Sequence, residues 1–155
     1  IDAAREIKSR LEEAGLAAFV KPSGGKGLHV MAPLKPAADW AAAKAFTKGL
    51  AEAMASDSPD LYVATISKAK RGGKILIDYL RNQRGATAVA AYSTRARPGA
   101  PVSMPVEWED LGPDLGPARF TVDNTPGHIA ARAADPFADF AAAAAPLAAP
   151  SRRKK

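Results

Sequence analysis

Residues 16–31, Leu16-Ala17-Ala18-Phe19-Val20-Lys21-Pro22-Ser23-Gly24-Gly25-Lys26-Gly27-Leu28-His29-Val30-Met31, place a glycine-rich loop between two short apolar runs. Such runs, separated by turn residues, are typical of a β-hairpin, here with strands over 16–20 and 28–31. The loop glycines let backbone amides approach a ligand, and a hydroxyl, an ammonium and an imidazole converge on the same turn. Phosphate oxygens suit this group, although a plain hairpin turn with a lysine at its tip is an equally good interpretation of the loop alone.

The loop differs from a Walker A motif, because Lys26 is followed by glycine rather than by serine or threonine. Strand alternation places His29 on the face opposite Leu28 and Val30. A single histidine on a strand is more often structural than functional, but the neighbouring loop favours a donor that holds a phosphate oxygen. The candidate phosphate contacts are therefore His29 and the loop residues Ser23, Gly24, Gly25 and Lys26.

Helical periodicity predicts two helices around this hairpin. The first ends at Gly15 and presents Ile7, Leu11 and Ala14 on one face. The second is capped by Asp39 and ends near 56–59, and its apolar stripe consists of Ala43, Phe46, Leu50 and Met54. Beyond it, β-prone runs predict strands at 61–66, 74–80 and 87–93, with a basic turn over 67–73 between the first two.

The last third of the chain is predicted to be less regular. Residues 97–117 are rich in proline and glycine, which indicates a lid or connector on the surface. Residues 120–122 are expected to form a short edge strand, and Asp135-Pro136 to start a last helix that buries Phe137, Phe140, Ala144 and Leu147. The order of elements predicts a mixed α/β (α+β) fold, with a mainly antiparallel sheet and flanking helices, in one domain over 1–149 and a basic tail over 150–155.

Composition favours an anionic partner. The chain has 155 residues and a formal net charge of +6, which fits binding to nucleic acid or nucleotides. It has no cysteine, so only oxygen or imidazole can hold a metal, and a reducing, cytoplasmic location is expected. There is no apolar run near about 18 residues and no signal-peptide pattern, so neither a membrane span nor a membrane partner is expected.

One acid stands within a strongly basic segment. Between Ser67 and Arg84 the only carboxylate is that of Asp78, and the bases around it are Lys68, Lys70, Arg71, Lys74, Arg81 and Arg84. On the predicted strand 74–80, Asp78 shares an apolar stripe with Leu76 and Leu80, where a carboxylate must be paired, hydrogen-bonded or metal-bound. An ion pair with Arg81, Arg71 or a neighbouring lysine is the more common arrangement, and a ligand for magnesium or manganese is the functional alternative.

The bases of this segment fit two uses. Arg71 is suited to clamp a triphosphate or a nucleic-acid phosphate, because its planar guanidinium offers two donors at once. An exposed charge at the tip of a hairpin is an equally good interpretation of it. A nucleic-acid backbone would be followed by Lys68, Lys70, Arg81, Asn82 and Arg84, although solvated loop charges would look the same. Arg95 and Arg97 carry a weaker signal, and His128, in a predicted loop, is interpreted as structural.

Four segments, taken in order, resemble a known family: residues 23–29, Ser67-Lys68-Ala69-Lys70-Arg71, Ile77-Asp78-Tyr79-Leu80-Arg81-Asn82 and Arg84-Gly85-Ala86-Thr87-Ala88-Val89. They are similar to the polymerase domain of bacterial ligase D, which belongs to the archaeo-eukaryotic primase superfamily. Tyr92-Ser93, residues 95–102 and Asp135-Pro136 extend the resemblance, which covers residue 1 to about residue 140. The fold it implies is the C-terminal half of a primase-polymerase.

This resemblance implies a nucleotidyltransferase of bacterial non-homologous end joining, which adds (ribo)nucleotides to DNA ends or gaps with Mg²⁺ or Mn²⁺. Ser23, Lys26 and His29 would contact the phosphates of a nucleoside triphosphate, with help from Arg71. Asp78 and His29 would be catalytic, with Asp78 as a metal ligand while a primer hydroxyl attacks the α-phosphate. Implied partners are a ligase domain in the same or another chain and a DNA end-binding protein, in the bacterial cytoplasm at the nucleoid.

The sequence departs from this family at one motif. The family's paired aspartates would precede residue 1, and Asp2 is not a replacement for them. Because two-metal transfer needs several carboxylates, we expect weak nucleotide binding and little catalysis from this chain alone. Two alternatives stay open: a non-catalytic nucleic-acid-binding module, and a regulatory domain that binds a small phosphorylated ligand.

Overall fold

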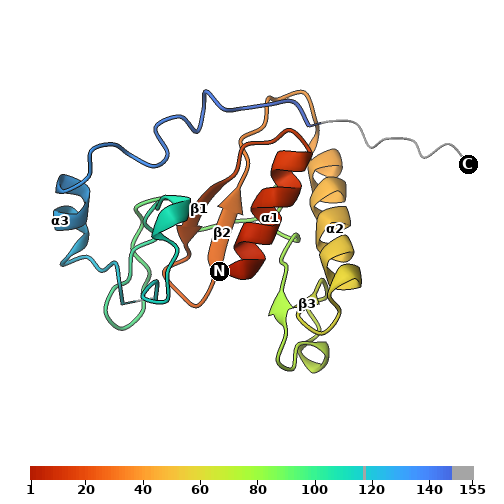
Figure 1. Ribbon diagram of the computed structural model, residues 1–155, viewed down its shortest axis with the longest axis horizontal. Coiled ribbons are helices and arrows are strands. Elements are labelled where there is room, and N and C mark those ends of the chain that lie inside the picture. Colours follow the sequence, from red (N-terminus) through yellow and green to blue (C-terminus); the bar gives the residue numbers. More distant parts are fainter. Residues whose placement is uncertain (117, 148–155) are drawn as a thin grey trace, which may run out of the picture. The chain divides into compact units, whose positions relative to one another are not determined.

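The computed structural model describes residues 1–116 and 118–147, which divide into two compact units. The first comprises Ile1–Pro33 and Val89–Ala145, and the second comprises Leu34–Ala88 with residues 146–147. The elements in chain order (Figure 1) are α1 (Asp2–Glu13), β1 (Phe19–Pro22), β2 (Leu28–Met31), α2 (Trp40–Asp57), β3 (Tyr62–Val63), the 3-10 helix η1 (Lys68–Lys70), β4 (Ile75–Leu76), the 3-10 helix η2 (Trp108–Asp110) and α3 (Thr125–Ala130). This mixture, with one small antiparallel and one small parallel sheet, confirms the predicted fold class. The predicted tail over 150–155 lies outside the described residues.

The glycine-rich loop joins β1 and β2 in an antiparallel hairpin, as predicted. Val20 pairs with Val30, and Lys21 pairs with His29. The first strand is shifted along the sequence relative to its expected range of 16–20, because it begins at Phe19 and continues to the edge of the loop. This shift brings a lysine into the strand, directly opposite the histidine.

Helix α1 lies beside β2 in the same unit (Figure 1). It buries Ala3, Ala4 and Leu11. Of the predicted apolar face, Leu11 is therefore confirmed as buried, and the buried face reaches closer to the N-terminus than predicted. Gly15 follows the helix with φ +75°, a left-handed conformation that commonly ends helices, which confirms the predicted stop.

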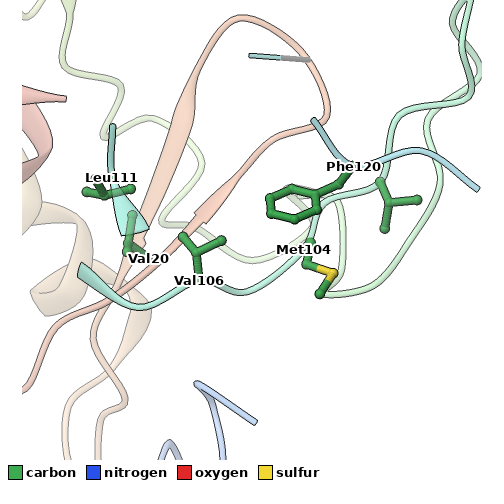
Figure 2. Close-up of a cluster of buried hydrophobic side chains, with 6 residues drawn as sticks. Val20, Met104, Val106, Leu111 and Phe120 are labelled. Carbon is green, nitrogen blue, oxygen red and sulfur yellow. The ribbon is translucent and has the colours of Figure 1, made fainter. Parts of the chain in front are cut away.

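The core of the first unit combines β1 with a segment predicted to be on the surface. The buried cluster (Figure 2) consists of Val20, Val102, Met104, Val106, Leu111 and Phe120. All residues over 101–106 are buried, so the prediction of a surface lid or connector over 97–117 is wrong for the centre of that range. Prolines limit regular pairing there. The segment is nevertheless fixed by isolated bridges from Val106 to Val20 and from Pro101 to Thr121.

Three further predictions of strands and helices are wrong. Residues 87–93, all of them described, form turns and irregular chain rather than a strand, and Tyr92 has φ 63°. Residues 120–122 contribute a single bridge at Thr121. Residues 135–147 form hydrogen-bonded turns and irregular chain instead of a helix. There the backbone N–H groups of Ala138 and Phe140 donate to the carbonyls of Asp135 and Phe137, and these bonds close separate turns without forming a continuous helical ladder. Phe137 and Phe140 both pack edge-on against Phe19, with ring centroids 5.5 and 5.0 Å away.

The second unit contains α2, and Asp39 caps this helix as predicted. Its Oδ1 accepts the backbone N–H of Ala42 at 2.7 Å. Strands β3 and β4 pair in parallel, Tyr62 with Ile75, so residues 67–73 belong to a crossover and do not close a hairpin. Both strands are much shorter than the predicted 61–66 and 74–80, and Asp78 therefore lies beyond β4. Within the described ranges, no helix has the length and apolar character to cross a membrane.

Candidate functional site

The glycine loop is closed by its own backbone. The N–H of Ser23 donates to the carbonyl of Gly27 at 2.9 Å. Gly24 has φ +66°, which L side chains rarely adopt, and a Cβ there would lie 2.6 Å from Cγ of Arg95. The same Cβ would lie 3.3 Å from the carbonyl oxygen of Pro101. Glycine is therefore required at this position by both the backbone angle and the available space.

Two arginines with a weak sequence signal, Arg95 and Arg97, lie against this loop. The Nη1 of Arg95 donates to the carbonyl of Ser23 at 3.2 Å. A Cβ built on Gly25 would stand 3.4 Å from Nη1 of Arg97 and 3.4 Å from Oγ of Ser23, so the guanidinium and the hydroxyl border the same glycine. The loop's own Ser23 hydroxyl and exposed Lys26, together with these two arginines beside it, make a group of donors that suits a polyanion. Arg95 and Arg97 are two positions apart, so in an extended chain their side chains point to the same side. This spacing is the sequence signal that could have predicted their shared position.

Lys21 is a residue that sequence patterns alone did not single out. It is 1% exposed, and its Nζ donates to the carbonyl of Val89 at 2.8 Å and to Oγ of Ser103 at 2.7 Å. The same nitrogen lies 3.4 Å from Nδ1 of His29 across the hairpin. Burial, followed by repulsion from Arg95, lowers the pKa of Lys21 from 10.5 to about 8. If the predicted strand 16–20 were extended to Pro22, where the observed strand ends, it would place Lys21 opposite His29.

The lowered pKa of Lys21 predicts a pH dependence of stability. The unfolded lysine keeps its proton up to 10.5 and the folded one only to about 8, so the free energy of unfolding should rise with pH between these values. The slope from one group is at most about 1.4 kcal/mol per pH unit. An opposite trend begins above 10.0, because burial and the hydrogen bond to Asp135 raise the pKa of Tyr92 from 10.0 to about 12.

Urea unfolding between pH 8 and pH 10 measures this rise. Lys21→Met is the reference, because it removes the titrating group and leaves the other ionisable side chains in place. The difference between the wild-type and Lys21→Met unfolding free energies should increase with pH across this window. A flat difference would contradict the prediction.

In the second unit, a pocket of about 560 Å³ opens beside Asp78. Arg71 and Arg81 line it, and Leu76 and Leu80 give it an apolar part. The pocket therefore combines a carboxylate, two guanidinium groups and apolar surface. It contains three of the residues that the sequence singles out for phosphate, metal or nucleic-acid binding.

Asp78 reaches solvent, with its side chain 38% exposed. Its Oδ1 accepts the backbone N–H of Leu80 at 3.0 Å, and its Oδ2 lies 3.5 Å from Nε of Arg81. The predicted place on an apolar strand face is wrong, because β4 ends at Leu76. The ion pair with Arg81 is confirmed, and at this exposure it contributes little to stability.

A metal site would need more than Asp78 offers. Across residues 1–116 and 118–147, no three histidine, cysteine, aspartate or glutamate side chains gather into a group that could hold a metal ion. A lone exposed carboxylate fits one ligand position of Mg²⁺ or Mn²⁺, but these ions take several oxygen ligands. The described residues therefore do not make a complete metal site, and the metal role of Asp78 stays a prediction.

The other predicted residues of this unit differ in how firmly they are held. Arg71 donates from Nη2 to the carbonyl of Ile66 at 2.6 Å, and in the described part of the chain its Nε is buried without a hydrogen-bond partner. Such a donor gains from any acceptor that binds beside it. Arg81 donates to the carbonyl of Thr87 at 2.7 Å. Asn82 is also tied to backbone, at the carbonyl of Tyr79. Lys68, Lys70 and Arg84 are exposed, as is Arg81 itself.

The predicted site residues thus form two groups. The hairpin of the first unit carries Ser23, Gly24, Gly25, Lys26 and His29, and the second unit carries Lys68, Lys70, Arg71, Asp78, Arg81, Asn82 and Arg84. His128 lies in α3 rather than in a loop, and its ring packs edge-on against Phe120 with centroids 5.0 Å apart. This packing agrees with its structural interpretation.

The fold of this chain is shared with a solved structure of a DNA repair protein. The chain superposes on a structure described as the polymerase domain from Mycobacterium tuberculosis ligase D in complex with DNA, with a TM-score of 0.82 and 31% sequence identity. The match covers 92% of this chain and 49% of that one, so the fold is that of a ligase D polymerase domain. A family model described as the LigD primase-polymerase domain matches residues 1–137. The chain belongs to the LigD primase-polymerase domain family, which confirms the resemblance drawn from its motifs.

Two similar proteins are much longer than this chain. The multifunctional non-homologous end joining protein LigD of Pseudomonas aeruginosa is 41% identical over 145 residues, which are 93% of this chain and 17% of that protein. The bifunctional non-homologous end joining protein LigD of Bacillus subtilis is 33% identical over 141 residues, which are 90% of this chain and 23% of that protein. The chain therefore spans less than a quarter of either relative.

Proposed function

We propose that this chain binds the triphosphate of an incoming nucleotide and serves nucleotide addition to DNA ends or gaps in non-homologous end joining. In that reaction a primer 3′-hydroxyl attacks the α-phosphate and pyrophosphate leaves. The observation that carries the proposal is the closed glycine loop, where Ser23 Oγ and the Arg97 guanidinium border one glycine and Arg95 holds the loop backbone. Family membership favours a nucleotide over other phosphates.

Each side chain has a separate part in this proposal. Lys26 and Arg97 offer charge-assisted hydrogen bonds to phosphate oxygens, and the Ser23 hydroxyl adds a neutral one. His29, on β2 next to the loop, donates from its ring to a further oxygen. Arg71 offers its planar guanidinium to an anion in the pocket beside Asp78.

A divalent ion, Mg²⁺ or Mn²⁺, belongs to the proposal as a cofactor that other carboxylates must help to hold. When bound, such an ion neutralises charge on the triphosphate. Asp78 would supply one oxygen ligand, after giving up or sharing its contact with Arg81. The chain's own part is therefore to bind and orient phosphates.

DNA is the proposed second substrate. The bases proposed to follow its backbone are Lys68, Lys70, Arg81 and Arg84, with Asn82 as a neutral donor. The Mycobacterium tuberculosis polymerase domain that this chain resembles was solved in complex with DNA. By analogy with the named relatives, a ligase domain in the same or another chain is a proposed partner. A DNA end-binding protein and a location at the bacterial nucleoid are proposed from the role in end joining alone.

Titration with ATP, with and without Mg²⁺, tests this function by calorimetry. The double variant Ser23→Ala/Lys26→Ala should bind ATP about tenfold more weakly or worse, because a hydrogen bond to a charged group contributes about 1.5–3 kcal/mol. Mg²⁺ should strengthen binding to the wild type, and Asp78→Asn should abolish that gain. The matched control is Asp114→Asn, which removes an exposed carboxylate of the first unit and should keep the gain.

A non-catalytic nucleic-acid-binding module is the second candidate, favoured by the exposed bases of the second unit and by the lone carboxylate beside them. It predicts DNA binding that weakens steeply with salt and needs neither Mg²⁺ nor nucleotide. If Mg²⁺ leaves ATP binding unchanged in the wild type and Asp78→Asn binds ATP equally well, this candidate replaces the nucleotidyltransferase.

A further inference from the structure

We propose that Lys21 is a positioning residue for His29: its buried ammonium faces Nδ1 of the ring and keeps the ring proton on Nε2. The two residues are paired across β1 and β2, with Nζ 3.4 Å from Nδ1. The contact itself is internal to the hairpin. Its meaning for activity rests on the proposed phosphate role of His29.

The donors and acceptors around Nζ fix the direction of this contact. A lysine ammonium has three hydrogens and no lone pair. One hydrogen goes to the carbonyl of Val89 at 2.8 Å, which can only accept. A second goes to Oγ of Ser103 at 2.7 Å, and this hydroxyl also accepts, because it donates its own hydrogen to the carbonyl of Pro22. The third faces Nδ1, which must therefore be the accepting, unprotonated nitrogen.

The surroundings prevent the ammonium from turning away. Lys21 is 1% exposed and Ser103 is fully buried, so water offers no replacement partners there. Ser103 belongs to the buried stretch 101–106, which also supplies Met104 to the core. The pKa of Lys21 is lowered only to about 8, so the side chain remains mostly protonated near neutral pH.

The consequence for the ring is a single neutral tautomer. With Nδ1 accepting, the neutral imidazole of His29 carries its proton on Nε2 and offers a donor there. A phosphate oxygen needs a donor, so this tautomer is the one that the proposed phosphate contact requires. Lys21 thus acts on nucleotide binding through His29 and does not itself touch the nucleotide.

Long-range ¹H–¹⁵N spectra of the 155-residue chain labelled with ¹⁵N-histidine test this assignment at about pH 7. The chain has two histidines, and His128→Gln identifies the other ring. We expect the Nε2–H form of His29 to exceed the Nδ1–H form about tenfold or more, and Lys21→Met to lower this ratio at least about threefold. Lys26→Met removes an exposed charge from the same loop and should leave the ratio unchanged.

A wild-type ring with its proton on Nδ1 would overturn the proposal. So would an unchanged ratio in Lys21→Met, provided that its amide spectrum shows the native fold. If Lys21→Met does not fold, the tautomer of His29 measured in the wild type is sufficient to support or overturn the proposal. Addition of MgATP then separates the two proposals: a ring in the Nε2–H form that does not respond to MgATP contradicts the phosphate role of His29 and leaves its positioning by Lys21 intact.

Discussion

Replacement of Met104 by alanine is expected to lower the free energy of unfolding by about 2–5 kcal/mol. Met104 is fully buried and belongs to the core cluster, whose other members include Val20, Val106 and Phe120 (Figure 2). Truncation removes apolar contacts on several sides and leaves a cavity that two prolines within the same buried stretch, Pro101 and Pro105, make hard to close. Urea unfolding followed by circular dichroism gives the change.

Two variants serve as controls for this substitution. Met104→Leu keeps most of the volume and should cost less than about 1.5 kcal/mol. Ile129→Ala removes a side chain that is 48% exposed and should change stability by no more than about 0.5 kcal/mol. If Met104→Ala lost no more stability than Met104→Leu, residues 101–106 would not be part of the core.

Replacement of Gly24 by alanine should have the largest effect on the loop. The left-handed backbone angle alone costs about 1–2 kcal/mol with a Cβ. The Cβ would also stand 2.6 Å from Cγ of Arg95 and 3.3 Å from the carbonyl of Pro101, so the arginine must move and release the carbonyl of Ser23. We expect a total loss of about 2–4 kcal/mol in stability and at least about tenfold weaker ATP binding.

Gly15→Ala is the matched control for Gly24→Ala. Gly15 has a similar φ of +75° in the same unit, but a Cβ there would meet nothing within 4 Å. This variant should show the backbone cost of about 1–2 kcal/mol and unchanged ATP binding. ATP binding by Gly24→Ala at wild-type strength would contradict the role of this loop, and calorimetry on both variants measures it.

The parts predicted correctly from sequence are those decided by local chemistry. The cap at Asp39, the stop at Gly15 and the glycine loop between two apolar runs each depend on a few neighbouring residues. The family resemblance came from linked motifs, and the match over residues 1–137 confirms it. The grouping of Ser23, Lys26 and His29 could also be predicted, because all three lie within one hairpin.

The parts that failed depend on contacts between distant residues. Proline and glycine over 97–117 resemble a surface connector, and only the tertiary contact with Val20 turns that stretch into core. The buried state of Lys21 depends on Val89 and Ser103, which are 68 and 82 positions away. The segment after Asp135 is held by the packing of Phe137 and Phe140 on Phe19, a residue far away in the sequence. Propensity and periodicity contain none of this information.

The hydroxyl of Ser103 joins the buried stretch to the start of the glycine loop, because it accepts from Lys21 and donates to the carbonyl of Pro22. A loop anchored to the core in this way is already ordered before any ligand arrives. Little conformational entropy is then lost on binding, so affinity should depend mainly on the contacts formed. The same anchor makes the rigidity of the loop depend on the core. Under the proposed function, a less well packed core should therefore weaken ATP binding before the chain unfolds.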